Sequence, residues 1–324
     1  MKTSNHLLRR LTAALLAAVL ALSIALPVFA SDDGDTIYIN SVSDLLSLAR
    51  SCAYDQWSVG KTVILQKDLS LEGMLWEPIP SFSGQFKGNG HTISDLTITG
   101  QYSPAGLFGI VEEQGSIESL SVRGVVSVSD SADTPSGGIV GVNHGTLISC
   151  QFTGVVTGDS EVGGIVGRNE SEGTIDHSTA RAIVTGKSST GGIAGYNLGA
   201  ITGCTNVGSI NTEYPEASLD TDGFTAKMVD YINNKMAAAD NDATNSVTNV
   251  ATDTGGIAGR SSGMILTSVN TGTIGYEHVG YNVGGIVGRT DGLVSGCVNQ
   301  GRVLGRKDVG GIAGQAEPYR ELDL

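Results

Sequence analysis

Short apolar segments recur along most of the chain at a nearly constant interval. The pentapeptide Gly-Gly-Ile-(Val/Ala)-Gly occurs six times, at successive intervals of 26, 28, 64, 29 and 26 residues. A degenerate copy, Ala105-Gly106-Leu107-Phe108-Gly109, precedes the first full copy by 32 residues. The long interval equals one repeat plus an insertion of about 36 residues. Such a fixed period is typical of repeat architectures. The full copies begin at Gly137, Gly163, Gly191, Gly255, Gly284 and Gly310.

Two further short apolar segments follow each pentapeptide, separated from it by Gly or Asn turns. In the first unit they are Gly145-Thr146-Leu147 and the segment around Val156. No segment reaches the 10–12 residues that a helix needs. The pattern therefore predicts three short strands per unit. The equivalent apolar residues in later units are Ile175, Ile201, Ile265 and Val294, and Val184, Ile210, Ile274 and Val303.

Three strands in 26–29 residues predict one coil of a parallel β-helix, in which each strand pairs with its equivalent in the next coil. The predicted fold class is all-β, a right-handed parallel β-helix solenoid. A β-propeller is the alternative, but its blades need about 40 residues. Equivalent side chains then stack about 4.8 Å apart. The inward stack is expected to be Ile139, Ile165, Ile193, Ile257, Ile286 and Ile312.

A small-residue column predicts the state of the cysteines. Cys150, Cys204 and Cys297 occupy one column, with Ser178 and Ser268 between them. Column mates two coils apart are separated by about 9.6 Å, whereas a disulfide needs Cα atoms within about 7 Å. Cys52 lies several coils earlier, so all four are expected to be free thiols, the column members buried.

The chain on either side of the repeats predicts a cap, an insertion and a tail. Residues 31–100 are expected to form an N-terminal cap and the first coils, and residues 101–317 the repeats. Ser41 or Ser43 can cap a short helix that shields the first coil. The insertion, residues 213–252, has apolar residues at helical spacing from Phe224 to Met236, with Asp222 as a cap. Residues 318–324 are either a minimal cap or part of a truncated coil; we expect the protein to continue.

The expected helix carries Leu45, Leu46, Leu48 and Ala49 on one side. Strands are expected at Thr36–Ile39, at residues 63–65, at Phe86, and at Ile93, Leu96 and Ile98.

Residues 1–30 have the pattern of a secretory signal. Lys2, Arg9 and Arg10 precede an apolar run, and Val28 and Ala30 fit cleavage after Ala30. An uncleaved anchor is the alternative, but the run of about 16 residues is short for a span of roughly 20. No later stretch is apolar enough to span a bilayer. The sequence therefore predicts a secreted or cell-surface protein.

The amino-acid composition and net charge limit the classes of ligand that the protein is expected to bind. The net charge is −14, and the predicted leader carries three basic and no acidic residues. The acidic mature chain is not expected to bind nucleic acid, which requires a basic surface. Gly contributes 46 residues and aromatics only 5%, as expected for many turns between short strands. Four Cys in 324 residues are too few for a disulfide scaffold.

The pentapeptide region resembles bacterial surface proteins with GLUG-type repeats. The resemblance rests on Val-Gly-Gly-Ile-Val-Gly-Arg-Asn at 162–169 and Gly-Gly-Ile-Ala-Gly-Tyr-Asn at 191–197, with the preceding segment 82–98. It covers roughly residues 36–317 and implies a pectin-lyase-like β-helix on an exported protein. Some relatives carry a metallopeptidase domain, but this chain has no His-Glu-x-x-His and its five His are scattered.

No catalytic constellation, phosphate loop or cofactor site stands out in the sequence. The acids lie mostly in turns, where solvated surface charge is the expected role. Asp220-x-Asp222-Gly223 resembles the start of a calcium loop, but Val229 stands where a bidentate Glu belongs. We therefore predict no metal, and a non-enzymatic binding, adhesion or spacer module. The alternative is a carbohydrate-active enzyme, a polysaccharide lyase or hydrolase.

One column is the candidate ligand site. The residue after each pentapeptide lies three positions past the inward Ile, so strand alternation points it outward. Arg and Tyr there could bind a glycan, an acidic polymer or another cell-surface ligand through stacking and forked hydrogen bonds. Solubilising charge beside a turn is the alternative. The candidate residues are Arg168, Tyr196, Arg260 and Arg289, between Val142 and Gln315.

Overall fold

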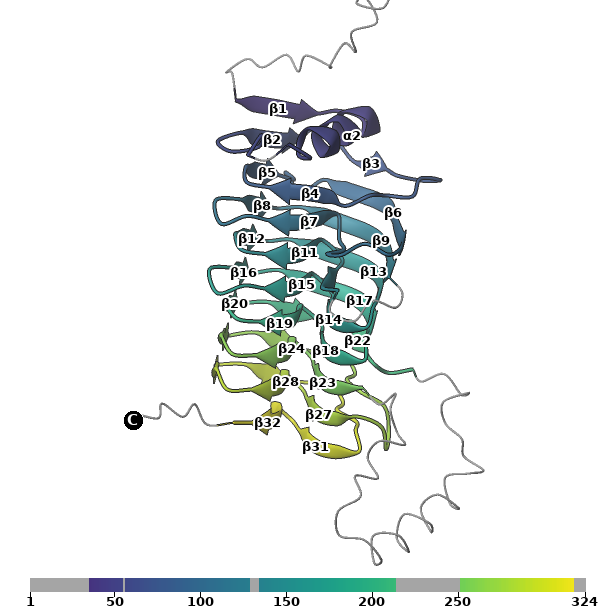
Figure 1. Ribbon diagram of the computed structural model, residues 1–324. Helices are drawn as coiled ribbons and strands as arrows, with labels where there is room; N and C mark the ends of the chain where they lie inside the picture. Colours follow the sequence, from purple (N-terminus) through teal and green to yellow (C-terminus); the bar gives the residue numbers. More distant parts are fainter. Residues whose placement is uncertain (1–34, 55, 129–133, 214–250, 318–324) are drawn as a thin grey trace, which may run out of the picture. The chain divides into compact units, whose positions relative to one another are not determined.

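The computed structural model describes residues 35–54, 56–128, 134–213 and 251–317. The chain divides into two compact units, Met1–Gly34 and Asp35–Leu324, and all described residues belong to the second. This second unit is a parallel β-solenoid in which the chain winds through successive coils (Figure 1). The predicted all-β parallel β-helix is confirmed.

Strands of successive coils stack into four parallel sheets, which we call A to D. Sheet A contains β1 (Thr36–Ile39), β2 (Thr62–Leu65), β5 (Gln85–Lys87), β8 (Ser116–Glu118), β12 (Thr146–Ile148), β16 (Thr174–Asp176), β20 (Ala200–Thr202), β25 (Met264–Leu266) and β29 (Leu293–Ser295). Sheet B contains β3 (Leu69–Ser70), β6 (Thr92–Gly100), β9 (Ser121–Val128), β13 (Gln151–Thr157), β17 (Thr179–Thr185), β21 (Thr205–Asn206), β26 (Val269–Asn270) and β30 (Val298–Asn299), with β22 (Ser209–Ile210) also pairing β17.

Sheets C and D complete the coil. Sheet C contains β4 (Ile79–Phe82), β7 (Phe108–Val111), β11 (Val140–Asn143), β15 (Val166–Asn169), β19 (Ala194–Asn197), β24 (Ala258–Ser261), β28 (Val287–Thr290) and β32 (Ala313–Ala316). Sheet D contains β10 (Ser136–Gly137), β14 (Ser160–Gly163), β18 (Ser188–Gly191), β23 (Thr252–Gly255), β27 (Tyr281–Gly284) and β31 (Lys307–Gly310).

The expectation of three strands per unit was wrong, because sheet D supplies a fourth. The pentapeptide is not one strand: Gly163 ends β14, Gly164 and Ile165 form a corner, and β15 begins at Val166. A Cβ on Gly164 would collide with the Gly192 carbonyl oxygen of the next coil. The paired glycines therefore permit this close turn. The sequence pattern did not predict sheet D because apolar and polar residues do not alternate in its short strands.

The inward isoleucine column forms as predicted. Ile139, Ile165, Ile193, Ile257 and Ile286 are fully buried, and backbone N–H groups of this column donate to the carbonyl of the equivalent residue one coil later. Ile312 is the exception at 42% exposed, because no described coil follows it. The stack supplies a continuous apolar core along the solenoid.

A helix covers the first coils, as the sequence predicts. Helix α2 (Val42–Ser51) begins after Ser41, whose hydroxyl accepts from the Asp44 backbone N–H at 3.2 Å. Leu45 and Leu48 are fully buried, whereas Leu46 and Ala49 are only half-buried. The helix packs on β1 and β4, so it lies at the end of sheet C where no strand precedes β4 (Figure 1).

Several expectations lie outside the described residues. They are the signal segment 1–30, the calcium-like Asp220–Gly223, the insertion helix and the tail 318–324. Of the predicted insertion 213–252, residues 214–250 are outside the description, and Thr252 already belongs to β23.

All four cysteines are free thiols, as predicted. Cys52, Cys150 and Cys204 are buried, whereas Cys297, in the last described coils, is only half-buried. The serines between them are part of the column's hydrogen bonding: Ser178 accepts from the Cys150 backbone N–H at 3.1 Å, and Ser268 from that of Cys204 at 3.2 Å.

Candidate ligand-binding strip

The outward column predicted from the repeats is present in sheet C. Each member is the register partner of the equivalent residue one coil further, and all members are partly exposed. At about 4.8 Å per coil, the four candidate residues span three coil rises. In coil order the column is Val142, Arg168, Tyr196, Arg260, Arg289 and Gln315.

A second column, in sheet D, contains side chains that the sequence pattern did not predict as site residues. The register pairs Ser160 with Ser188 and Val162 with Thr190, and the single residue between these positions in each strand takes no part in the ladder. The residues at this position all have φ between 50° and 55°, the left-handed region. They are Glu161, Ser189, Asp253, Asn282 and Asp308.

Each of these left-handed residues precedes a member of the sheet C column by seven residues in the sequence. The first pair is in direct contact. Arg168 donates from Nε to Glu161 Oε2 at 2.6 Å and from Nη2 to Oε1, and its Nη1 lies 3.8 Å from Glu170. The hydrogen bonds to Glu161 raise the pKa of Arg168, and partial burial opposes them. We call the two columns together the strip.

The other cationic members have different partners. Arg289 donates to Glu317 at 2.6 Å, which raises its pKa, and Asp253 and Asp291 add to the effect. The Arg260 guanidinium lies 5.2 Å from the centre of the Tyr196 ring, within the range of a cation–π contact. The Tyr196 hydroxyl lies 3.4 Å from Ser262 Oγ.

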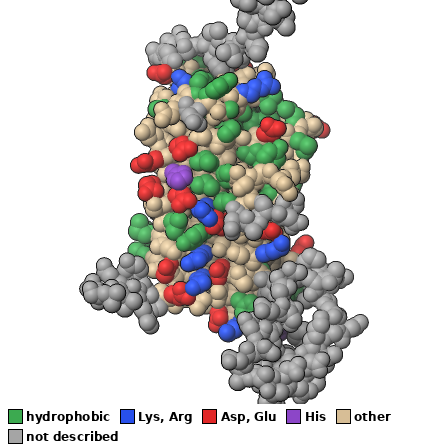
Figure 2. All heavy atoms as spheres, viewed as in Figure 1, with side chains coloured by type: hydrophobic (Ala, Val, Ile, Leu, Met, Phe, Trp, Pro, Cys, Tyr) green, Lys and Arg blue, Asp and Glu red, His purple; other side chains and the backbone are tan. Residues whose placement is uncertain are grey.

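The strip is therefore charge-compensated rather than cationic. Arg168 pairs with Glu161 of sheet D and lies near Glu170, and Arg289 pairs with Glu317, whereas Asp253 of sheet D accepts from Asn282 Nδ2 at 2.7 Å. Figure 2 shows basic and acidic side chains interleaved on the lower half of the face that sheet C presents. The sequence carried a signal, an acid seven residues before Arg168 and Arg260, but only the fold shows that Glu161 contacts Arg168.

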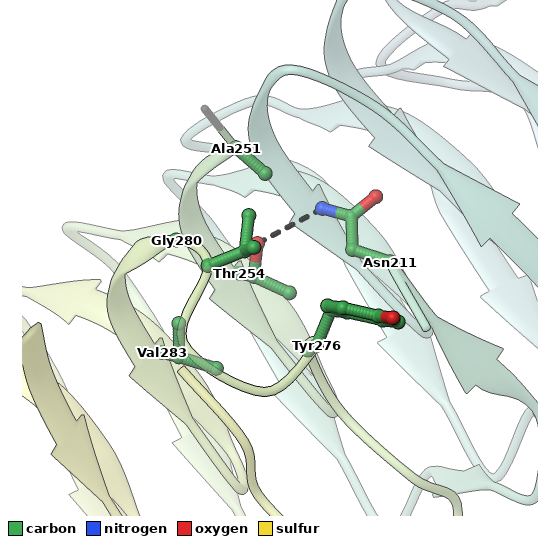
Figure 3. Close-up of a pocket in the computed structure, with 8 residues that line it drawn as sticks. Asn211, Ala251, Thr254, Tyr276, Gly280 and Val283 are labelled. Atoms are coloured by element: carbon green, nitrogen blue, oxygen red, sulfur yellow. Dashed lines mark hydrogen bonds between the residues drawn. The ribbon is translucent and has the colours of Figure 1, made fainter. Parts of the chain in front are cut away.

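A small pocket lies between the sheet D strands and the loop after Ile274. Asn211, Ala251, Thr254, Tyr276, Gly280 and Val283 are among its lining residues (Figure 3). Its volume of about 10 Å³ is near the smallest that holds one water molecule. The Asn211 amide fills its polar side by donating to Thr254 Oγ1 at 2.9 Å. This hollow has no room for an organic ligand.

Other metal-ligating and acid–base side chains in the described ranges are not clustered. No three His, Cys, Asp or Glu side chains there form a group that could hold a metal ion. The nearest to an acid–base pair is His177 Nδ1, 2.8 Å from Asp176 on the exterior of sheet A. The helix of the described ranges is neither long nor apolar enough to cross a membrane.

No protein-family model matches the chain. Halomucin from Haloquadratum walsbyi is 31% identical over 155 residues, covering 44% of this chain and 2% of halomucin. The "Putative Gly-rich membrane protein" of Evansella cellulosilytica is 29% identical over 137 residues, covering 31% of this chain and 16% of that protein. The chain thus spans less than a fifth of the length of either relative.

Among solved structures, a putative immunoglobulin A1 protease from Bacteroides ovatus has a similar fold. The TM-score is 0.55 over 87% of this chain and 84% of that one, at 18% identity. At this identity the likeness shows the β-helix fold alone. The chain is accordingly a β-helix repeat protein related over part of its length to halomucin and a Gly-rich membrane protein.

Proposed function

We propose that the chain is an exported module that binds a glycan or another surface partner at the cell exterior and leaves it unchanged. The observation that supports this proposal is the strip, a line of partly exposed Arg, Tyr and carboxylate side chains in successive coils of the solenoid. Repeats of this kind place equivalent groups at a fixed spacing, which suits an extended partner.

Export and repeat type belong to the same proposal. The leader pattern of residues 1–30 and the acidic mature chain support secretion or surface display. The pentapeptides at 162–169 and 191–197 support membership of the GLUG-type repeats with a pectin-lyase-like fold. The partial likeness to a protein named as a membrane protein is compatible with display at the cell surface.

Two measurements test this function. Produced with its own leader in a bacterium, the chain should begin at Ser31 and be accessible to protease on intact cells or in the medium. The purified mature chain should be retained by at least one member of a polysaccharide panel and release no reducing ends or unsaturated products from it. Retention of the chain in the cytoplasm, or turnover of any polysaccharide, would contradict the proposal.

A further inference from the structure

We propose that the strip takes an uncharged polysaccharide, bound with its chain along the solenoid axis, and not an acidic polymer. This inference rests on the proposed function and names the ligand class of its site. The conclusion differs from the expectation drawn from the arginines alone, which admitted a polyanion.

Electrostatics disfavours the acidic polymer. Both Arg168 and Arg289 are engaged by carboxylates at 2.6 Å, and Glu170 lies 3.8 Å from the first of them. A polyanion would have to displace these carboxylates or lie beside them, and like charges at close range repel. Around the strip the carboxylates outnumber the guanidinium groups, on a chain that is already acidic.

Hydroxyl groups fit the same surface. A sugar hydroxyl both donates and accepts, so it can donate to a carboxylate oxygen and accept from a guanidinium N–H in the same coil. The strip and the acid beside it offer both kinds of group: the side chains of Arg168 and Arg289 are 34% and 33% exposed, that of Glu161 is 12% exposed, and that of the neighbouring Glu317 is 40% exposed. Hydrogen bonds to charged groups are the stronger ones, which favours a polar, uncharged ligand.

The Tyr196–Arg260 pair supplies the apolar contact that a sugar ring needs. Their cation–π contact at 5.2 Å holds the ring and the guanidinium plane together. No carboxylate partner is observed for Arg260 in the described part of the chain, so its donors are available to a ligand. Successive coils rise by about 4.8 Å, similar to the length of one sugar unit in an extended chain, so one sugar can meet one coil.

The experiment is affinity electrophoresis of the full mature chain in gels that contain a neutral β-glucan, a neutral mannan or an anionic polygalacturonate. We expect retardation by a neutral polymer and none by polygalacturonate. The double variant Tyr196→Ala/Arg260→Ala should weaken retardation at least about tenfold, because aromatic and Arg side chains dominate binding surfaces. A matched control removes one Tyr and one Arg elsewhere: Tyr38, on β1, and Arg123, on β9, are both exposed.

A second variant reverses the selectivity. Glu161→Gln/Glu317→Gln removes the two carboxylates that pair with Arg168 and Arg289 and should create retardation by polygalacturonate that weakens with added salt. Circular dichroism and thermal melting verify that every variant is folded. Stronger retardation of the wild type by polygalacturonate than by the neutral polymers would overturn the inference. So would equal losses in the strip and control variants, although retention itself would then still support the proposed function. Absence of retardation by every polymer would overturn the inference and leave a non-glycan surface partner as the proposed function.

Discussion

Two buried threonines in one inward column of sheet D differ in whether the hydroxyl has a partner. Thr190 and Thr254 are register partners, and Val162 and Val283 occupy the same column. Thr254 Oγ1 accepts from the Asn211 amide, whereas Thr190 Oγ1 has no hydrogen-bond partner. A buried polar group without a partner costs about 1–3 kcal/mol.

The change Thr190→Val should therefore raise the free energy of unfolding by about 1 kcal/mol, since valine fits this column and removes the unpaired hydroxyl. Thr254→Val should lower it by about 1–2 kcal/mol, because the Asn211 amide then loses its acceptor. Urea titrations followed by circular dichroism measure both. Changes of the same sign for both variants would contradict this reading of the column.

The cysteines offer a second test at the residue scale. Burial raises the pKa of the Cys150 and Cys204 thiols from 9.0 to about 12, and it also raises that of Cys297. Because the thiolate is the reactive form, the native chain at pH 8 should be alkylated first at half-buried Cys297. Mass spectrometry of the denatured, unreduced chain should show four labels. Two or fewer labels would mean that a disulfide exists and that the coil register is wrong.

The raised pKa values of the buried thiols determine how the free energy of unfolding changes with pH. Above about pH 9 a thiol in the unfolded chain loses its proton, whereas Cys150 and Cys204 keep theirs in the fold until about pH 12. The unfolded state then binds fewer protons, so these two groups make stability fall as pH rises through that window.

At the scale of the sheets, the inward stack forms the core, and one member from its middle and its last described member give a matched pair of mutations. Ile193 is fully buried between coils, whereas Ile312 in the same column is 42% exposed. Ile193→Asp buries an unpaired carboxylate and should cost several kcal/mol, enough to abolish a cooperative melt. Ile312→Asp keeps its charge in water and should shift the melting temperature by a few degrees at most. If Ile193→Asp melts like the wild type, the column does not form the core.

These elements were predicted from the spacing of apolar residues. Features that depend on polar contacts between coils were not predicted. The isoleucine stack and the cysteine column follow from residues that recur at one interval, and helix α2 follows from its serine cap and its apolar side. The buried amide ladder does not: Asn143 donates to Asn169 and Asn169 to Asn197, each at 2.8 Å. In the sequence these are only turn asparagines, and their stacking depends on the corner between sheets C and A.

The sequence predicts where the candidate residues lie, but not which carboxylates pair with them. The outward placement of Arg168 and Tyr196 follows from counting along the strand. The partner of Arg168 is Glu161, a residue with φ 53° in a strand that alternation alone does not reveal. A cationic stripe and a charge-balanced strip favour different classes of ligand, so this ion pair is what the proposed ligand class depends on.

The described solenoid behaves, at the scale of the whole molecule, as a one-dimensional stack, because each strand pairs only with its equivalents in adjacent coils. Its stability is then approximately a sum of coil terms and nearest-neighbour interfaces. Stacked polar ladders and the apolar column repeat in each coil, so no single coil is unique to the fold. The solenoid should therefore tolerate a change of length in whole coils and in no other step.

Removal of residues 160–187, one 28-residue coil from Ser160 to its register partner Ser188, tests this directly. Asp159 then joins Ser188, each sheet keeps its order, and Glu161 and Arg168 leave together, while the partly exposed Asp159 loses its ion pair with Lys187. We expect a folded chain with a cooperative but lower melting transition by circular dichroism, because one interface between coils is lost. The control removes only residues 160–173, which places the sheet A strand β16 where sheet D continues and breaks every later register. Cooperative melting of the control as well would show that coil registry does not specify this fold.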